Sequence, residues 1–216
     1  MIRFTLFTAI IFLFIGCQDI STSSLIKGPD KKQTSTELQP GDIIFQSSMS
    51  GQSHAIQLAT NSKYSHVGIL FEKDGEMMVY EAVQPVRISE LDEWISRGDD
   101  EHYVVKRLKN ANESLTSSTI EKMQEEATRH LGKNYDLYFG WSDKRIYCSE
   151  LVWKIYNRTL DMEVGKPQLL KDFDLTHPIV KQKLKERYGN DIPYDEKVIS
   201  PGAMFESELL EEVHSD

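Results

Sequence analysis

The sequence predicts an α+β fold, and three features support this prediction. "HVGILFE" and "MMVYEAV" are β-rich runs joined by "KDGE", and the Asp74-Gly75 pair in this joint is a strong signal for a tight hairpin. "TSSTIEKMQEEATRHLG" is typical of a helix that Thr116 or Ser117 caps and that ends at Gly132. From Cys148 onward, apolar residues recur at the i, i+3, i+4, i+7 spacing of a helix that faces a core.

The other elements follow in chain order. "GDIIFQ" predicts a short buried strand, and "SHAIQLATNS" a helix capped by Ser53. After the hairpin we expect a short helix at "SELDEWISR" and a strand at "HYVVKRL". The loop "KNYDLYFGWSDKRI", rich in aromatic residues, precedes the helix that starts at Cys148. A helix from Ile179 to Tyr188 and a final extended piece, "VISPGAMFES", complete the chain.

The N-terminus has the pattern of a bacterial lipoprotein signal. Arg3 precedes an apolar run that is too short to span a bilayer, and Gly16 precedes Cys17. Phe14 stands where such signals usually have Leu, so an uncleaved anchor or plain secretion stays open. We expect a signal peptide at 1–16, a polar tether at 17–37 with lipidated Cys17, and one domain at 38–216. The protein would then be exported and anchored in the bacterial cell envelope.

Charge and cysteine content limit the possible functions. The net charge of −9 argues against a nucleic-acid groove, which needs a basic surface. The basic cluster in "KQKLKERYG" and the acidic end "ESELLEEVHSD" are both expected to be solvated. No histidine spacing indicates a metal site, so neither a metal nor a cofactor is expected. If Cys17 is lipidated, Cys148 is an unpaired thiol outside the cytoplasm, which requires an explanation.

The hairpin register brings two polar residues together. If Lys73 opposes Glu76, then Gly68 opposes Glu81, and His66 lies diagonal to Glu81 on the same face. An imidazole–carboxylate hydrogen bond is then feasible, although one extra loop residue would turn Glu81 to the other face. Alternatively, Glu81 is an exposed edge-strand residue and His66 a structural histidine.

Cys148 also allows two interpretations. Its place on an apolar stripe is typical of a buried structural cysteine. Its place at a helix start, however, lowers the pKa of a thiol and can stabilise an oxyanion. A cysteine with a histidine and an acid forms the set in which the base takes the thiol proton and the acid orients the base.

Six segments in order resemble one known family: "LQPGDIIF", "AIQLATNSKYSHVGIL", "YEAV", "GKNYD", "YCSELVW" and "ISPGAMFES". They are similar to the circularly permuted papain-like cysteine hydrolases of the NlpC superfamily, specifically the YiiX-like branch. The resemblance implies a permuted papain-like fold with a small antiparallel sheet or half-barrel packed on the cysteine helix. It also implies that Cys148 is the nucleophile, His66 the base and Glu81 the orienting acid.

The resemblance indicates further site residues and a substrate class. Tyr135 in "GKNY" corresponds to a pocket tyrosine able to donate to an oxyanion, and Tyr64 is a second candidate. We therefore expect an envelope cysteine hydrolase that cleaves an amide or ester of a cell-wall peptide, an amino-acid amide or an acyl lipid. An acyltransferase, a non-catalytic lipid- or peptide-binding lipoprotein and an envelope scaffold are the alternatives. The oligomeric state is open.

Overall fold

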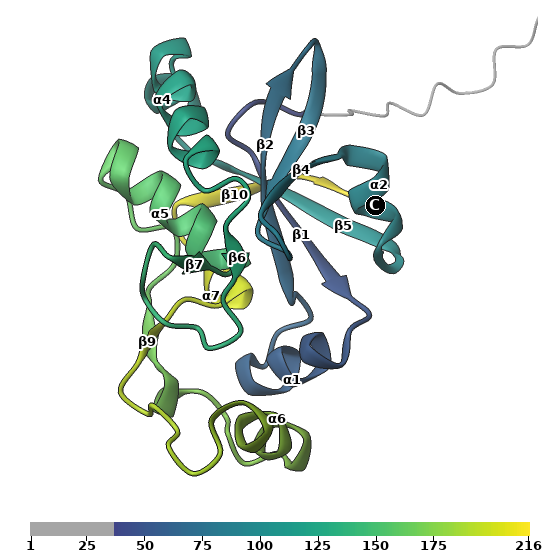
Figure 1. Ribbon diagram of the computed structural model, residues 1–216. Helices are drawn as coiled ribbons and strands as arrows, with labels where there is room; N and C mark the ends of the chain where they lie inside the picture. Colours follow the sequence, from purple (N-terminus) through teal and green to yellow (C-terminus); the bar gives the residue numbers. More distant parts are fainter. Residues whose placement is uncertain (1–36) are drawn as a thin grey trace, which may run out of the picture. The chain divides into compact units, whose positions relative to one another are not determined.

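A six-stranded antiparallel sheet is the framework of the folded chain (Figure 1). The computed structural model describes residues 37–216. The strand order is β10-β5-β1-β2-β3-β4. Its strands are β1 (Ile43–Ser48), β2 (His66–Lys73), β3 (Glu76–Glu81), β4 (Arg87–Glu90), β5 (Gly98–Leu108) and β10 (Leu210–Ser215). The expected signal peptide, and the tether with Cys17 up to residue 36, lie outside the described residues.

Helices and short strands surround this sheet. The helices are α1 (Gly51–Thr60), α2 (Leu91–Ser96), α3 (Ala111–Ser114), α4 (Ser117–Thr128), α5 (Cys148–Leu160), η1 (Leu170–Asp172), α6 (Pro178–Tyr188) and α7 (Pro201–Phe205). Strands β6 (Asn134–Tyr135) and β7 (Arg145–Ile146) pair in parallel, and β8 (Gln168–Leu169) and β9 (Lys197–Val198) pair antiparallel. None of the helices among residues 37–216 is long and apolar enough to cross a membrane.

The two faces of the sheet carry separate apolar clusters. Phe45, Val67 and Ile69 face the larger cluster, which includes the buried side of α5. Ile44 and Leu70 face a smaller cluster that contains Trp94 of α2. Helices α4 and α5 pack against each other, as do α1 and α6 (Figure 1). The sheet is therefore covered by the cysteine helix on one face and by α2 on the other.

Several sequence predictions needed correction. Ser50, not Ser53, caps α1, because the hydroxyl of Ser50 accepts the backbone N–H of Ser53 at 3.1 Å. The sequence also missed β4, and "VISPGAMFES" contains helix α7 after a two-residue strand. The acidic end is not merely solvated: β10 pairs with β5 at the edge of the sheet and buries Leu210. An edge strand has one solvated face, so its charged residues conceal its pairing.

The basic cluster is also only partly solvated. Lys181 and Lys185 are exposed, but Lys183 and Arg187 are half-buried and line a cavity next to α1. Because α6 packs on α1, residues on its inner face point toward that cavity whatever their charge.

Candidate active site

The hairpin β2–β3 brings His66 to Glu81. The pairs Lys73–Glu76, Phe71–Met78 and Ile69–Tyr80 confirm the predicted register. The Nε2 atom of His66 lies 2.7 Å from Oε2 of Glu81, which is 0% exposed. Glu81 is therefore not the exposed edge-strand residue of the alternative interpretation.

Glu81 stays ionised in this buried position because several donors surround it. Its second oxygen, Oε1, accepts the hydroxyl of Ser89 at 2.6 Å and the guanidinium groups of Arg97 and Arg87 at 2.5 and 3.3 Å. Burial by itself raises the pKa of Glu81, but hydrogen bonds and charge from His66, with help from Ser89 and Arg97, lower it to about 2. The carboxylate therefore keeps a full negative charge beside the imidazole.

Cys148 begins helix α5 and lies next to His66. The side chain is only 3% exposed. Burial raises the pKa of the thiol, but hydrogen bonding to His66, the charge of His66, and backbone groups of Val67 and Ser149 together lower it. Burial likewise lowers the pKa of His66, but Cys148 and Glu81 outweigh this effect and raise it to about 9. Both shifts favour a thiolate–imidazolium pair.

The ring of His66 is held in one orientation. It stacks on Trp94 with the ring centroids 5.7 Å apart and an interplanar angle of 25°. Since Nε2 is hydrogen-bonded to Glu81, Nδ1 is the nitrogen left for the thiol. Two neighbours thus fix both the plane of the imidazole and the nitrogen that faces sulfur.

The start of α5 is fixed by the segment around Ile199. The hydroxyl of Ser149 donates to the carbonyl of Ile199 at 2.8 Å, and the Ile199 N–H donates to the hydroxyl of Tyr147 at 3.1 Å. Glu150 accepts the N–H of Tyr147 at 3.3 Å, which caps the helix. These contacts position the thiol at the first turn, where backbone N–H groups have no intrahelical partner.

Of the two candidate tyrosines, only Tyr135 lies at the site. Tyr135 lies beside Cys148, because β6 pairs with the strand β7 that leads into α5. Its hydroxyl accepts a hydrogen bond from Nε2 of Gln52 at 3.1 Å. Tyr64 instead packs its ring against Phe45 and Phe205, with centroids 5.9 and 4.1 Å away, and lines neither of the two cavities that adjoin Cys148 and His66.

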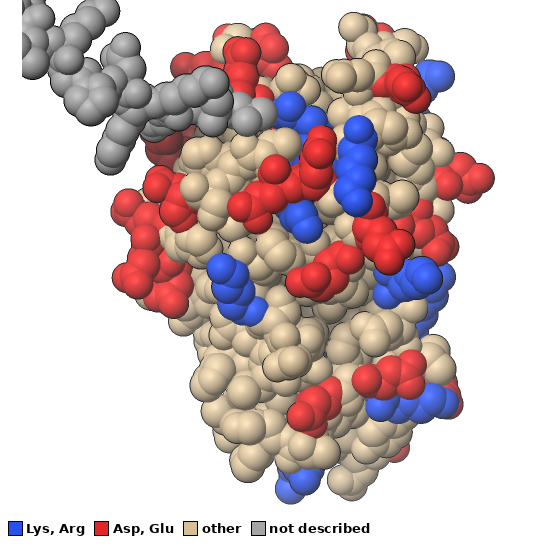
Figure 2. Space-filling view, turned by 180° about the vertical axis from the view of Figure 1, so that it is seen from behind, with Lys and Arg blue, Asp and Glu red and all other residues tan. Residues whose placement is uncertain are grey.

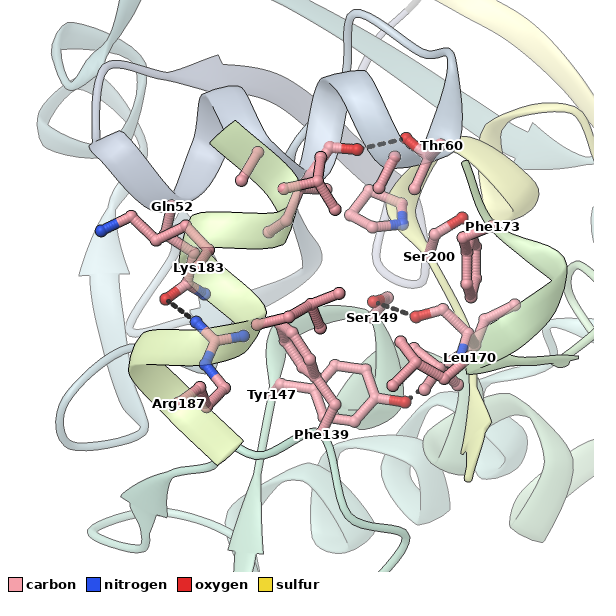
Figure 3. Close-up of a pocket in the computed structure, with 18 of the residues that line it drawn as sticks. Gln52, Thr60, Phe139, Tyr147, Ser149, Leu170, Phe173, Lys183, Arg187 and Ser200 are labelled. Carbon is pink, nitrogen blue, oxygen red and sulfur yellow. Dashed lines mark hydrogen bonds between the residues drawn. The ribbon is translucent and has the colours of Figure 1, made fainter. Parts of the chain in front are cut away.

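Two cavities adjoin the reacting pair. The first, which we call the thiol-side cavity, is lined by Cys148 and a mostly apolar wall that includes Phe139, Leu170, Phe173, Val180, Leu184 and Val198. In Figure 3, Gln52 and Arg187 point toward each other on one side of this cavity, and Phe173 and Leu170 lie on the opposite side. The second, the imidazole-side cavity, is lined by His66, by serine and glutamine side chains, and by the apolar side chains of Ile56, Ala82, Val83 and Leu137.

Comparison with known proteins gives the family. Residues 37–214 match Peptidase_C92, described as permuted papain-like amidase enzymes of the YaeF/YiiX, C92 family. The chain belongs to this C92 family. It is 50% identical over 172 residues to the protein YiiX of Escherichia coli strain K12, covering 80% of this chain and 84% of YiiX.

A solved structure of a C92 relative supports the same assignment. The crystal structure of YiiX from Escherichia coli O157:H7 matches with a TM-score of 0.79 and 49% identity, covering 82% of this chain and 97% of that one. The predicted α+β, permuted papain-like fold is confirmed, including an antiparallel sheet that packs on the cysteine helix through β2. As a member of a papain-like amidase family, the protein is a cysteine hydrolase.

The Escherichia coli O157:H7 protein of that crystal structure is described as a metalloprotein. In the part of this chain that the structure describes, no three His, Cys, Asp or Glu side chains form a group suited to a metal ion. The donors around Glu81 are instead hydrogen-bond donors from Arg, Ser and His, which compete with a cation for the carboxylate. The site of this C92 chain does not fit a metal.

Sequence reasoning missed five residues of the site: Ser89, Arg87 and Arg97 on Glu81, Trp94 beside His66, and Gln52 on Tyr135. A signal for Ser89 and Arg87 existed. "VRIS" alternates apolar and polar residues, which is typical of a third strand beside the hairpin. Recognising β4 would have placed Ser89 beside β3 and close to Glu81.

Proposed function

We propose that this protein is a cell-envelope cysteine hydrolase that cleaves an amide or ester bond through an acyl-enzyme on Cys148. The alignment of Cys148, His66 and Glu81 is the observation that supports this proposal. Cys148 is the nucleophile, His66 the base, and Glu81 the residue that orients and charges His66.

The mechanism follows from the ion pair. The thiolate of Cys148 attacks the carbonyl carbon of the substrate. The resulting oxyanion accepts hydrogen bonds from the backbone N–H of Cys148 and the hydroxyl of Tyr135. The imidazolium of His66 then protonates the leaving amine or alcohol as the C–N or C–O bond breaks. Water, deprotonated by His66, attacks the thioester, and the carboxylic acid leaves as Cys148 is restored.

The surroundings support two substrate classes. The apolar wall of the thiol-side cavity accommodates an acyl chain or an apolar peptide side chain next to the sulfur. The N-terminal sequence up to Cys17 supports a location at the cell envelope, where acyl lipids and cell-wall peptides both occur. We therefore propose an acyl-lipid or cell-wall peptide substrate.

Figure 2 shows one face of the folded unit on which basic side chains are separated by acidic and uncharged ones. This distribution is consistent with our prediction that the protein binds no nucleic acid.

The pH dependence of Cys148 alkylation by iodoacetamide tests the proposed nucleophile. We expect Cys148 of the full-length protein to be alkylated at pH values well below the ordinary thiol pKa of about 8.5. Peptide mass spectrometry follows the modification of Cys148. In His66→Ala the reactivity at neutral pH should fall at least about tenfold, since loss of one pKa unit of thiolate stabilisation is a factor of ten.

Glu81→Gln is the intermediate variant in this experiment. It keeps a hydrogen-bonding group of the same size but removes the charge, so the apparent thiol pKa should lie between those of wild type and His66→Ala. If the apparent pKa of the Cys148 thiol is that of an ordinary thiol and neither substitution changes it, the nucleophile–base pair is refuted. A non-catalytic binding protein would then be the better interpretation.

A further inference from the structure

The two cavities adjoin different residues of the reacting pair. Cys148 lines the thiol-side cavity and not the other, whereas His66 lines the imidazole-side cavity and not the first. Gln52, Ile56 and Tyr135 line both and therefore form the partition between them.

This partition is held by hydrogen bonds. Gln52 donates to the Tyr135 hydroxyl at 3.1 Å and accepts from Arg187 at 3.2 Å. The backbone N–H of Tyr135 donates to Oε1 of Gln84 at 2.7 Å. A substrate that reaches both sulfur and imidazole must therefore place one end on each side of Tyr135.

The chemistry of the two linings differs. Beside its apolar residues, Ile56, Ala82, Val83 and Leu137, the imidazole-side cavity carries the hydroxyls of four serines and the amides of two glutamines: Ser48, Ser50, Ser53, Ser65, Gln52 and Gln84. Apart from His66, none of the described residues that line it is charged at neutral pH. Hydroxyl and amide groups favour an uncharged ligand that exchanges hydrogen bonds. The charge of the His66 imidazolium is already paired with the carboxylate of Glu81, so it is not a free counter-charge for a ligand.

The reaction assigns each end of the substrate to a cavity. The acyl carbon becomes bonded to sulfur, so the acyl group stays on the side of Cys148 until water releases it. The leaving nitrogen takes its proton from His66 as its bond to carbon breaks, so the amine departs on the side of His66. This inference rests on the acyl-enzyme mechanism proposed above.

We propose that the imidazole-side cavity is the leaving-group site, and that it accepts an uncharged, hydroxyl-bearing amine. The substrate class is then an amide with an apolar acyl group, seated in the thiol-side cavity, on a small neutral polar amine. Cleavage yields the free fatty or apolar carboxylic acid and the amine.

Three synthetic amides test this polarity with the full-length protein. N-octanoyl-2-amino-1,3-propanediol has the proposed arrangement, N-octanoylglutamate carries an acidic leaving group, and N-octylglyceramide reverses the polar and apolar ends. We expect kcat/KM for the first to exceed both others at least about tenfold, since hydrogen-bonding sites discriminate strongly against groups that leave them unpaired.

Variants separate the two cavities by kinetic step. The p-nitrophenyl ester of octanoic acid gives the same octanoyl-enzyme, from which the leaving group has already departed. Ser48→Phe and Val83→Phe, which narrow the imidazole-side cavity, should slow acylation by the propanediol amide about tenfold or more and leave deacylation unchanged. Ala59→Phe, which narrows the thiol-side cavity, should change both steps.

Each outcome decides something. A preference for N-octylglyceramide or N-octanoylglutamate would overturn the assignment of the leaving-group site, and so would slower deacylation in both Ser48→Phe and Val83→Phe. Failure of the ester to form an octanoyl adduct on Cys148, measured by mass spectrometry, would instead refute the proposed acyl-enzyme mechanism and this inference with it.

Discussion

Glu81 shows how a single buried charge organises the site. Its two carboxylate oxygens are used differently: Oε2 binds the imidazole of His66, and Oε1 binds Ser89 and the guanidinium groups of Arg87 and Arg97. A buried carboxylate without such partners would be protonated, and a neutral acid would not stabilise an imidazolium. The arginines therefore affect the thiol indirectly, because they keep Glu81 charged and Glu81 stabilises the imidazolium that pairs with the thiolate.

The pH dependence of stability should report this charge. The pKa of Glu81 in the folded protein is about 2, below its ordinary value of 4.5. Its contribution to stability is thus fully present above pH 4.5 and is lost as the pH falls toward 2. We expect that, as the pH falls between those limits, wild type loses up to about 3 kcal/mol more of its free energy of unfolding than Glu81→Gln does. Urea unfolding at a series of pH values measures this difference. Parallel curves for the two proteins would contradict the ionised, paired state of Glu81.

At the scale of elements, the β2–β3 hairpin needs a glycine opposite Glu81. A Cβ atom on Gly68 would lie 2.4 Å from Cγ1 of Val79 and 3.3 Å from the carbonyl oxygen of Tyr80. The space beside the His66–Glu81 pair is therefore filled by the neighbouring strand. The hairpin carries both polar residues, so its close packing sets their separation.

Gly68→Ala should therefore disturb both stability and the site. We expect a loss of about 1–3 kcal/mol in the free energy of unfolding, typical of overpacking, together with slower alkylation of Cys148 at neutral pH. The double variant Gly68→Ala/Val79→Ala restores the space and is the matched control. If the double variant recovers no thiol reactivity relative to Gly68→Ala, the contact with Val79 does not position His66.

At the scale of the whole molecule, chain order and tertiary position are independent. His66 begins β2 early in the chain and Cys148 begins α5 much later, yet the two meet because α5 packs on β2. This order is the permuted arrangement of the C92 family. The polar segment before residue 38 separates this folded unit from Cys17, which we propose as the lipid anchor.

Removal of Cys17 tests the proposed location. In a bacterial host, the wild-type protein should sediment with membranes and incorporate labelled palmitate, whereas Cys17→Ala should lose the label, because Cys17 is the proposed acylation site. His66→Ala is the control, since a change in the folded unit should leave both properties intact. Equal palmitate labelling of wild type and Cys17→Ala would contradict a lipoprotein.

The sequence by itself determined the local elements and one part of the site. The Asp74-Gly75 turn fixed the hairpin register, because side chains alternate with period two, and the register placed His66 beside Glu81. The spacing after Cys148 likewise indicated helix α5, although the structure buries every residue from Cys148 to Tyr156 and not one face alone. Only the tertiary structure decided what surrounds these groups. Trp94 lies in α2, Arg97 at the C-terminal end of the same helix, and Gln52 in α1. Their contacts depend on how α1 and α2 pack, which no local spacing encodes. The same holds for the separation of Cys148 and His66 into a mostly apolar cavity and one that also carries four serines, because cavities form between elements and not within them.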